Sequence, residues 1–152
     1  MKNDNRLFVS KGWGYEDWIV NTPLYCGKDL FLKKDKKLSL HYHKLKDETF
    51  WVTSGKVCLT YYDEIEIDQL FPVWDGNLYL WSGVRPHLAS VATNELRDIA
   101  CLHLHQIVLD AGDSFHIPIG RRHTLYGLLD SHITEFSTEH FDEDSIRILH
   151  GD

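Results

Sequence analysis

Two histidines and a glutamate lie at a spacing that suits a transition-metal ion. His41 and His43 are one residue apart, and Glu48 follows after the short segment 44–47. In a β-strand, residues i and i+2 point to the same side, so the two imidazoles would project together. First-row transition metals accept imidazole nitrogens and carboxylate oxygens as ligands. Residues 40–55 therefore predict one part of a metal site.

A second stretch supplies a further ligand candidate, His123. Residues 112–123 have the pattern Gly-x5-Pro-x-Gly-x2-His, in which Pro118 and Gly120 predict a turn before the strand with His123. Three imidazoles and one carboxylate leave a divalent ion (Zn, Mn, Ni, Co or Fe) with open positions for water or substrate oxygens. Such a centre can polarise a sugar carbonyl for isomerisation, bind dioxygen as Fe(II), or simply hold a ligand. The ligand set alone does not choose among these functions.

Together the two stretches resemble the two motifs of the cupin superfamily, in the same order along the chain. In cupins these motifs bind one metal inside a small β-barrel. Two positions depart from the usual motifs, because Asp35 replaces a glycine of the first and Gly127 replaces an asparagine of the second. We expect these departures to change turn and strand details only. The resemblance assigns four metal ligands: His41, His43, Glu48 and His123.

Shorter stretches resemble cupin isomerases, which interconvert aldoses and ketoses with a divalent metal. Residues 20–28 and 133–138 are similar to D-lyxose isomerases. Residues 144–148 are similar to the C-terminal cupin domain of type II mannose-6-phosphate isomerases. This resemblance implies a sugar or sugar phosphate as the ligand. It also carries over Arg147, for which we expect an ion pair that closes the barrel.

An isomerase of this kind needs a base and a proton donor beside the metal. Glu135 is our first candidate for the base, because its alternating strand should line the barrel. Lys28 shares one face of the run 25–32 with apolar residues, and it could stabilise or protonate the enediolate oxygen. For both residues the alternative is a solvated charge on the surface.

Other polar residues have ordinary structural interpretations. His103 and His105 repeat the His-x-His spacing, but no carboxylate follows them at ligand spacing. For His116 we expect packing or a hydrogen bond on a strand. Arg121 and Arg122 alternate in direction, so at most one faces the pocket, where it could bind phosphate. We expect solvent to be the destination of that side chain.

The segments around these motifs predict a chain of short β-strands. About ten alternating or β-branched runs are separated by Gly and Pro turns, with little helical periodicity, which predicts an all-β jelly-roll barrel of the cupin type. Residues 1–152 have the length of a single domain. Within it we expect an N-terminal arm over about 1–15, and between the motifs an insertion over about 63–98 that forms a hairpin or lid.

The composition of the chain limits its partners and its location. Acidic residues outnumber basic ones, 23 to 16, and the formal charge is -7, so we expect no nucleic-acid partner. Neither a signal-peptide core nor an apolar run of 18 residues is present, so we expect a cytoplasmic protein without membrane contact. Three widely spaced cysteines without a CxxC pair fit a reduced compartment. We expect a homodimer, because edge strands need cover and Phe8, Trp13 and Trp18 could offer an apolar surface.

Three functions remain open at this point. The first is a metal-dependent sugar isomerase, the second an Fe(II) dioxygenase, and the third a non-catalytic sugar-binding cupin. Cupin epimerases, which work without a metal through a His–Asp pair, fit less well because the ligand set here is complete.

Overall fold

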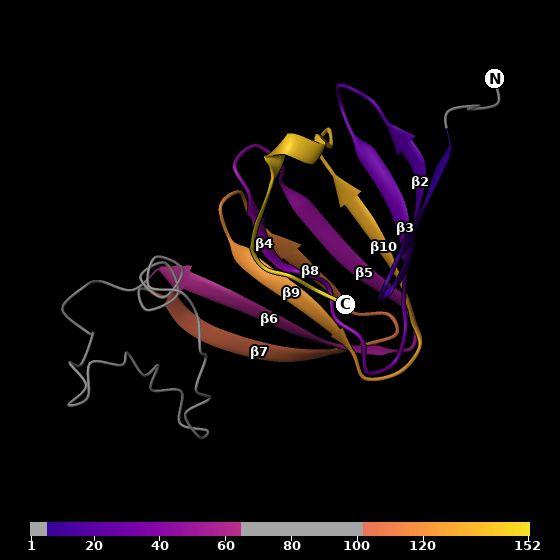
Figure 1. The fold of residues 1–152 in the computed structure, drawn as a ribbon, viewed down its shortest axis with the longest axis vertical. Coiled ribbons are helices and arrows are strands. Elements are labelled where there is room, and N and C mark those ends of the chain that lie inside the picture. The colour runs from indigo at the N-terminus through magenta and orange to yellow at the C-terminus, as the bar shows by residue number, and fades with distance from the viewer. Residues whose placement is uncertain (1–5, 65–101) are drawn as a thin grey trace. The chain divides into compact units, whose positions relative to one another are not determined.

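The structure, a computed structural model, describes residues 6–64 and 102–152 and is built almost entirely of β-strands (Figure 1). Within these two ranges the helical structure is one 3-10 turn, η2, Asp142–Asp144. One sheet has the strand order β1-β2-β3-β10-β5-β8, and the other has the order β11-β4-β9-β6-β7. The strands are β1 Leu7–Lys11, β2 Gly14–Asn21, β3 Cys26–Leu32, β4 Leu40–His43, β5 Glu48–Ser54, β6 Lys56–Glu64, β7 Leu102–Asp110, β8 Ser114–Ile117, β9 Arg122–Gly127, β10 Ser131–Ser137 and β11 Ser145–Leu149.

The chain divides into two compact units. The first contains residues 1–61 and 106–152, and it carries every candidate site residue. The second contains residues 62–105, of which the structure describes 62–64 and 102–105. The insertion expected over about 63–98 therefore lies almost wholly outside the described residues, as does Cys101.

Alternation along the strands separates a buried face from an exposed one, as the sequence predicts for an all-β protein. In β3 every second residue is buried, from Cys26 to Leu32, and in β10 the buried positions include Ile133. Apolar residues of both sheets form one core cluster, which includes Phe50 of β5 and Leu59 of β6. Because each sheet buries one face against the other, the two sheets enclose an interior.

Strand pairing brings distant parts of the chain together at this interior. Strand β10 lies between β3 and β5, so Glu135 is opposite Lys28 on one side and Phe50 on the other. In the second sheet β4 lies between β11 and β9, so His41 is opposite both Arg147 and His123. Residues directly opposite in an antiparallel pair project to the same face. The pairing therefore places five polar residues on inward faces that otherwise carry the core.

The two departures from the cupin motifs lie side by side, one in a turn and the other at the end of strand β9. Asp35 has a φ of 60°, in the left-handed region that glycine adopts at lowest cost and that Asp tolerates better than most residues. A Cβ at Gly127 would lie 2.4 Å from the carbonyl oxygen of Lys33, so glycine is required there by the close approach of the backbone. The amide of Asp35 donates to the Gly127 carbonyl at 2.8 Å, so a backbone hydrogen bond joins the two positions. Both departures lie outside the metal ligands, as expected.

The N-terminal arm expected over about 1–15 is part of a β-hairpin. Strand β1 pairs with β2 along its whole length, from Leu7 opposite Trp18 to Lys11 opposite Gly14. Trp13 packs against the barrel, is only 6% exposed and belongs to the core cluster. The prediction that Trp13 offers a surface to a partner is therefore wrong, because the turn of the hairpin directs its ring inward.

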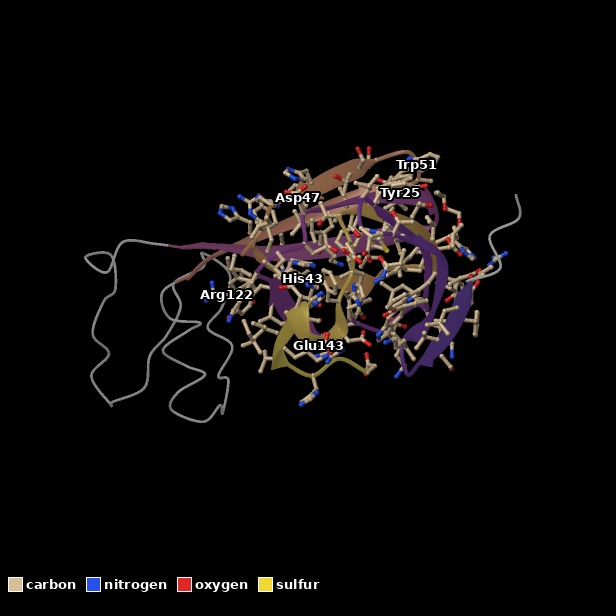
Figure 2. All side chains as sticks on the ribbon, turned by 90° about the horizontal axis from the view of Figure 1, so that it is seen from above. Tyr25, His43, Asp47, Trp51, Arg122 and Glu143 are labelled. Atoms are coloured by element: carbon tan, nitrogen blue, oxygen red, sulfur yellow. The ribbon has the colours of Figure 1, made fainter. Side chains whose placement is uncertain are left out.

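The outer surface of the barrel carries several large side chains. Figure 2 shows His43 within the barrel, whereas Trp51 lies at its surface, where it is 43% exposed. Both described cysteines are free; Cys26 is buried and Cys58 is half-buried. None of the helices among the described residues is long and apolar enough to cross a membrane.

Candidate metal centre

The four predicted metal ligands come together in the interior of the barrel. His41 and His43 project from β4, Glu48 begins β5, and His123 follows the first residue of β9. Potential ligand atoms of all four residues lie within 4.8 Å of one another. The four residues therefore form one group, as the spacing of the two motifs predicts.

Backbone carbonyls fix the orientation of all three imidazole rings. The Nδ1 atom of His41 lies 2.9 Å from the Ser39 carbonyl oxygen. The Nδ1 atom of His43 lies 3.2 Å from the carbonyl oxygen of Asp144, and that of His123 lies 3.0 Å from the carbonyl oxygen of Arg121. A carbonyl oxygen only accepts, so each Nδ1 carries the proton and each Nε2 keeps its lone pair. This arrangement is typical of histidines that bind a metal through Nε2.

Several buried atoms at the centre of the group have no hydrogen-bond partner. These atoms are the Nε2 atoms of His43 and His123 and both carboxylate oxygens of Glu48. The Nε2 atom of His123 lies 2.9 Å from Oε1 of Glu48, but without the alignment of a hydrogen bond. Buried polar atoms are normally paired, so their convergence needs an explanation. Oε2 of Glu48 forms an ion pair with Lys46, and a divalent transition metal fits the remaining three atoms, because one cation would satisfy them together.

The protonation states in this group suit metal binding. Burial lowers the pKa of His41 well below its usual value, and burial together with Lys46 lowers that of His43 to about 4. Burial alone would raise the pKa of Glu48, but its contacts with His123 and Lys46 outweigh this and lower it well below its usual range. Two neutral imidazoles and an ionised carboxylate are the forms that a metal requires at neutral pH.

The loop between the two halves of the first motif is held by Asp144, which is 7% exposed. Its carboxylate accepts hydrogen bonds from the backbone N–H groups of Lys44, Leu45 and Lys46, at 2.9 to 3.2 Å. Its carbonyl oxygen accepts the hydrogen bond from His43 described above. Asp144 thus holds both the ligand loop and one ligand ring. We noted residues 144–148 for their resemblance to isomerases, but no pattern indicates this contact.

A buried network of charges lies beside the ligands. Nζ of Lys46 lies 2.8 Å from Oε1 of Glu135 and also forms an ion pair with Glu48. Nζ of Lys28 lies 3.5 Å from the same oxygen of Glu135. Lys28, Lys46 and Glu135 are 2%, 3% and 4% exposed, so the inward positions expected for Lys28 and Glu135 are confirmed. Lys46 was missed, because it lies in a loop without periodicity and long charged residues are seldom buried.

Within this network, Glu135 and Lys46 hold each other in their charged forms. Burial would raise the pKa of Glu135, but Lys46 and Lys28 outweigh it and lower the pKa to about 2. Burial would lower the pKa of Lys46, but Glu135 and Glu48 outweigh it and raise that pKa above its usual value. Glu135 is therefore a carboxylate at every ordinary pH, and its basicity is low.

His140 extends the network from Lys28 towards the surface. Its Nδ1 atom accepts a hydrogen bond from Nζ of Lys28 at 3.0 Å, and its Nε2 donates to Asp142 at 3.3 Å. Trp18 lies edge-on to His140 at 4.5 Å, and Nζ of Lys28 lies 4.3 Å from the centre of a Trp18 ring. Trp18 is half-buried and thus contributes to the interior network, and its role in an apolar surface for a partner stays a prediction. No sequence signal marked His140.

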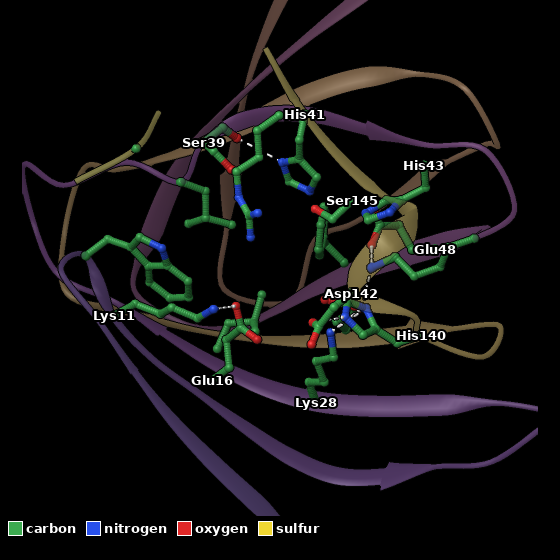
Figure 3. A pocket seen from close by; sticks show the side chains of 18 of the residues that line it. Lys11, Glu16, Lys28, Ser39, His41, His43, Glu48, His140, Asp142 and Ser145 are labelled. Atoms are coloured by element: carbon green, nitrogen blue, oxygen red, sulfur yellow. Dashed lines mark hydrogen bonds and ion pairs between the residues drawn. The ribbon is translucent and has the colours of Figure 1, made fainter. Parts of the chain in front are cut away.

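Three of the four ligands, His41, His43 and Glu48, line one cavity of about 240 Å³ together with the charged network (Figure 3). Lys11 and Glu16 form an ion pair at its side, and Ser39 and Ser145 also line it. Arg147 lines the cavity as well. The ion pair expected for Arg147 is not formed with any residue of 6–64 or 102–152, because its side chain turns to the cavity beside His41.

The remaining polar candidates lie outside this cavity. Nε2 of His116 lies 2.9 Å from Oδ1 of Asp47, which is the hydrogen bond expected for it. Arg121 stacks over Tyr61 at 5.1 Å and Arg122 over Tyr42 at 4.9 Å, so neither lines the cavity within the described part of the chain. The side chain of His103 lies outside the described residues, and His105 is not among the grouped ligands.

Comparison with solved structures identifies the fold. KdgF from Halomonas sp. superposes with a TM-score of 0.53 at 14% identity, covering 85% of this chain and 81% of KdgF. The capsular polysaccharide assembling protein CapF from Staphylococcus aureus gives a TM-score of 0.61 at 16% identity, covering 95% of this chain. The oxalate decarboxylase of Lactobacillus farciminis, in a formate complex, gives 0.62 at 13% identity, covering 97%. This chain spans only 34% of CapF and 35% of that decarboxylase.

These similarities show that the protein has the cupin fold, as the two motifs indicate. No protein-family model matches the chain, and no curated protein matches it in sequence. At 12–16% identity the comparisons identify the architecture and not the reaction. The chemistry must therefore be argued from the site itself.

Proposed function

We propose that the protein is a metal-dependent isomerase that interconverts an aldose and a ketose, with a sugar or sugar phosphate as its substrate. The observation that carries this proposal is the buried network of Lys28, Lys46 and Glu135 directly beside the four-ligand group. Aldose–ketose isomerisation needs a Lewis acid, a base and a proton donor in one small cavity. A site that only held a structural metal would have no need of three charged side chains buried next to it.

The reaction divides into two proton movements. A bound divalent ion would polarise the carbonyl and the adjacent hydroxyl of the sugar. Glu135 removes the proton from the carbon next to the carbonyl and returns it to the former carbonyl carbon. Lys28 donates a proton to the carbonyl oxygen and regains one from the neighbouring hydroxyl. Atoms and charges therefore balance over one turnover, and both residues end in their starting states.

Lys46 and His140 are assigned supporting roles in this proposal. Lys46 joins Glu48 to Glu135, so it fixes the base relative to the metal ligands. His140 accepts a hydrogen bond from Lys28 and donates one to the exposed Asp142. It therefore connects the proton donor to solvent. The lowered pKa of Glu135 makes proton removal from carbon the slow step that we expect.

The compared proteins are compatible with this proposal at a coarse level. CapF is a capsular polysaccharide assembling protein, which agrees with a carbohydrate ligand. The oxalate decarboxylase of Bacillus subtilis has Mn(II) centres, which agrees with manganese as one of the divalent metals expected here.

A non-catalytic sugar-binding cupin is the second candidate function. It is favoured by the low basicity of Glu135, since two ammonium groups hold the pKa of that carboxylate at about 2. For an Fe(II) dioxygenase, no feature of the described site gives comparable support. It would be recognised by firm retention of iron and by oxygen uptake.

Solvent hydrogen exchange separates the isomerase from the binding protein. The metal-loaded protein is incubated in heavy water with lyxose, mannose, xylulose, fructose and their phosphates, and the sugars are followed by NMR. An isomerase should convert aldose to ketose or introduce deuterium at the carbon next to the carbonyl. Absence of both with every sugar would reject the isomerase for these substrates and favour the binding protein.

A further inference from the structure

Most charged side chains that line the cavity already have a partner of opposite charge. Lys11 contacts Glu16 at 3.2 Å, and Lys28 and Lys46 share Glu135. The acids at the opening are also engaged: Asp142 accepts from His140, and Asp152 contacts Lys36 and the backbone N–H of Lys37. Arg147 differs from all of these, because no ion pair joins it to a residue in the described ranges 6–64 and 102–152.

The position of Arg147 relates it directly to the metal centre. In the pairing of β11 with β4, Arg147 is opposite His41, so both side chains project to the same face. Both line the cavity, together with Ser39 and Ser145 from the same two strands or their ends. Arg147 is exposed and His41 is partly buried. Arg147 therefore forms a solvent-exposed part of the wall of the cavity that the ligands line.

We propose that Arg147 is a binding subsite for an acidic group, carboxylate or phosphate, carried by the sugar that the metal centre binds. This assignment rests on the proposed function, since it assumes that the sugar reacts beside His41, His43, Glu48 and His123. A guanidinium presents a planar fork of N–H donors that matches two oxygens of either group. The formal charge of the protein is -7, whereas Arg147 adds a positive charge to the cavity wall without an acidic partner among the described residues. This local positive charge favours an anionic group on the ligand.

The acidic residues of the cavity do not neutralise the charge of Arg147. Glu16 and Asp152 also line the cavity, and each is held by its own cation. The substrate would therefore supply the anion that Arg147 lacks. Because Arg147 is exposed at the opening, we expect it to act mainly on affinity, whereas Lys28 and Glu135 act on the chemical step.

The test is a binding measurement that needs no turnover. Xylitol, xylonate and xylitol 5-phosphate are titrated by calorimetry into the metal-loaded protein, its Arg147→Gln variant and an Arg6→Gln control. The control removes the same unit of charge at an exposed ion pair with Asp17, away from the cavity. The wild type and the control should bind at least one acidic polyol about tenfold more tightly than xylitol, and Arg147→Gln should bind all three about equally.

The two acidic probes identify the source of the charge. Preference for the phosphate alone indicates a sugar phosphate, and preference for xylonate alone indicates a sugar acid. The proposal is overturned if the wild type binds the neutral and acidic probes equally or binds none of them. It is also overturned if Arg147→Gln keeps the preference, because the carboxylate or phosphate would then be bound by the metal or a lysine. Failure of the isomerase proposal would appear separately, in the heavy-water experiment. There the sugars would be neither converted nor labelled with deuterium, although the acidic probes still bind tightly.

Discussion

Replacing Asp144 by alanine should loosen the metal site from a position about one hundred residues away in sequence from the ligand loop. The carboxylate accepts four hydrogen bonds from three backbone N–H groups, those of Lys44, Leu45 and Lys46. Bonds to a charged acceptor are each worth about 1.5–3 kcal/mol. Lys44 and Leu45 are exposed, so water can replace part of what their N–H groups lose, whereas Lys46 is buried. We therefore expect a loss of about 2–4 kcal/mol in the free energy of unfolding.

The same substitution should weaken metal binding, because the loop sets the position of Glu48 relative to His43. Loss of an outer partner of a metal ligand typically costs 10- to 100-fold in affinity, or about 1.4–2.8 kcal/mol. Zinc affinity is measured by competition with a chelator, and stability by urea unfolding of the metal-free protein. Glu143→Ala is the matched control, since Glu143 lies in the same turn η2 and is exposed.

Zinc affinity and the free energy of unfolding can each contradict the role assigned to Asp144. Asp144→Asn keeps one side-chain acceptor, and it should fall between the wild type and Asp144→Ala in both measurements. If Asp144→Ala folds and binds zinc as tightly as Glu143→Ala does, the loop holds its shape without the carboxylate. The positioning role of Asp144 would then be rejected.

Four further predictions concern other parts of the molecule. Glu135→Gln should lower the isomerisation rate by roughly 10²–10⁴ with metal content unchanged, and a rate equal to wild type would exclude Glu135 as the base. Because the folded pKa of Glu135 lies below its usual value, its stabilising effect should be complete above about pH 4.5 and fade towards pH 2; urea unfolding should show the difference from Glu135→Gln shrinking over that window. Burial raises the pKa of the Cys26 thiol, so iodoacetamide should label it at pH 8 only after unfolding, as peptide mass spectrometry would show. Light scattering should give the mass of a homodimer, since edge strand β1 carries Phe8 at 61% exposure; a clean monomer at micromolar concentration would disprove this.

Local patterns in the sequence were sufficient to predict the grouping of three histidines with one glutamate and the all-β fold. The His-x-His spacing of His41 and His43 depends only on the period of a strand, and the turn at Gly120 depends only on backbone conformation, with a φ of 83°. Alternation likewise placed Lys28 and Glu135 on inward faces before any pairing was known. Such features are visible because each is decided within a few neighbouring residues.

The rest of the site depends on pairing between distant strands, which a single sequence does not contain. Lys46 is buried because β10 brings Glu135 beside β5, and nothing in the loop itself indicates this. Asp144 reaches the ligand loop because β11 pairs with β4. Arg147 was expected to form an ion pair, but the same register turns it into the cavity next to His41. Trp13 was expected to offer part of an apolar surface to a partner, whereas the β1–β2 hairpin buries it.

Anomalous X-ray diffraction from crystals grown with manganese or zinc tests the central claim most directly. We predict one strong anomalous peak in the barrel, at about 2.0–2.2 Å from Nε2 of His41, His43 and His123 and from a carboxylate oxygen of Glu48. The peak should disappear in crystals of His123→Ala while the two sheets remain folded. A peak elsewhere in the cavity, or no peak in wild-type crystals saturated with either metal, would contradict the assignment of these four residues as a metal centre.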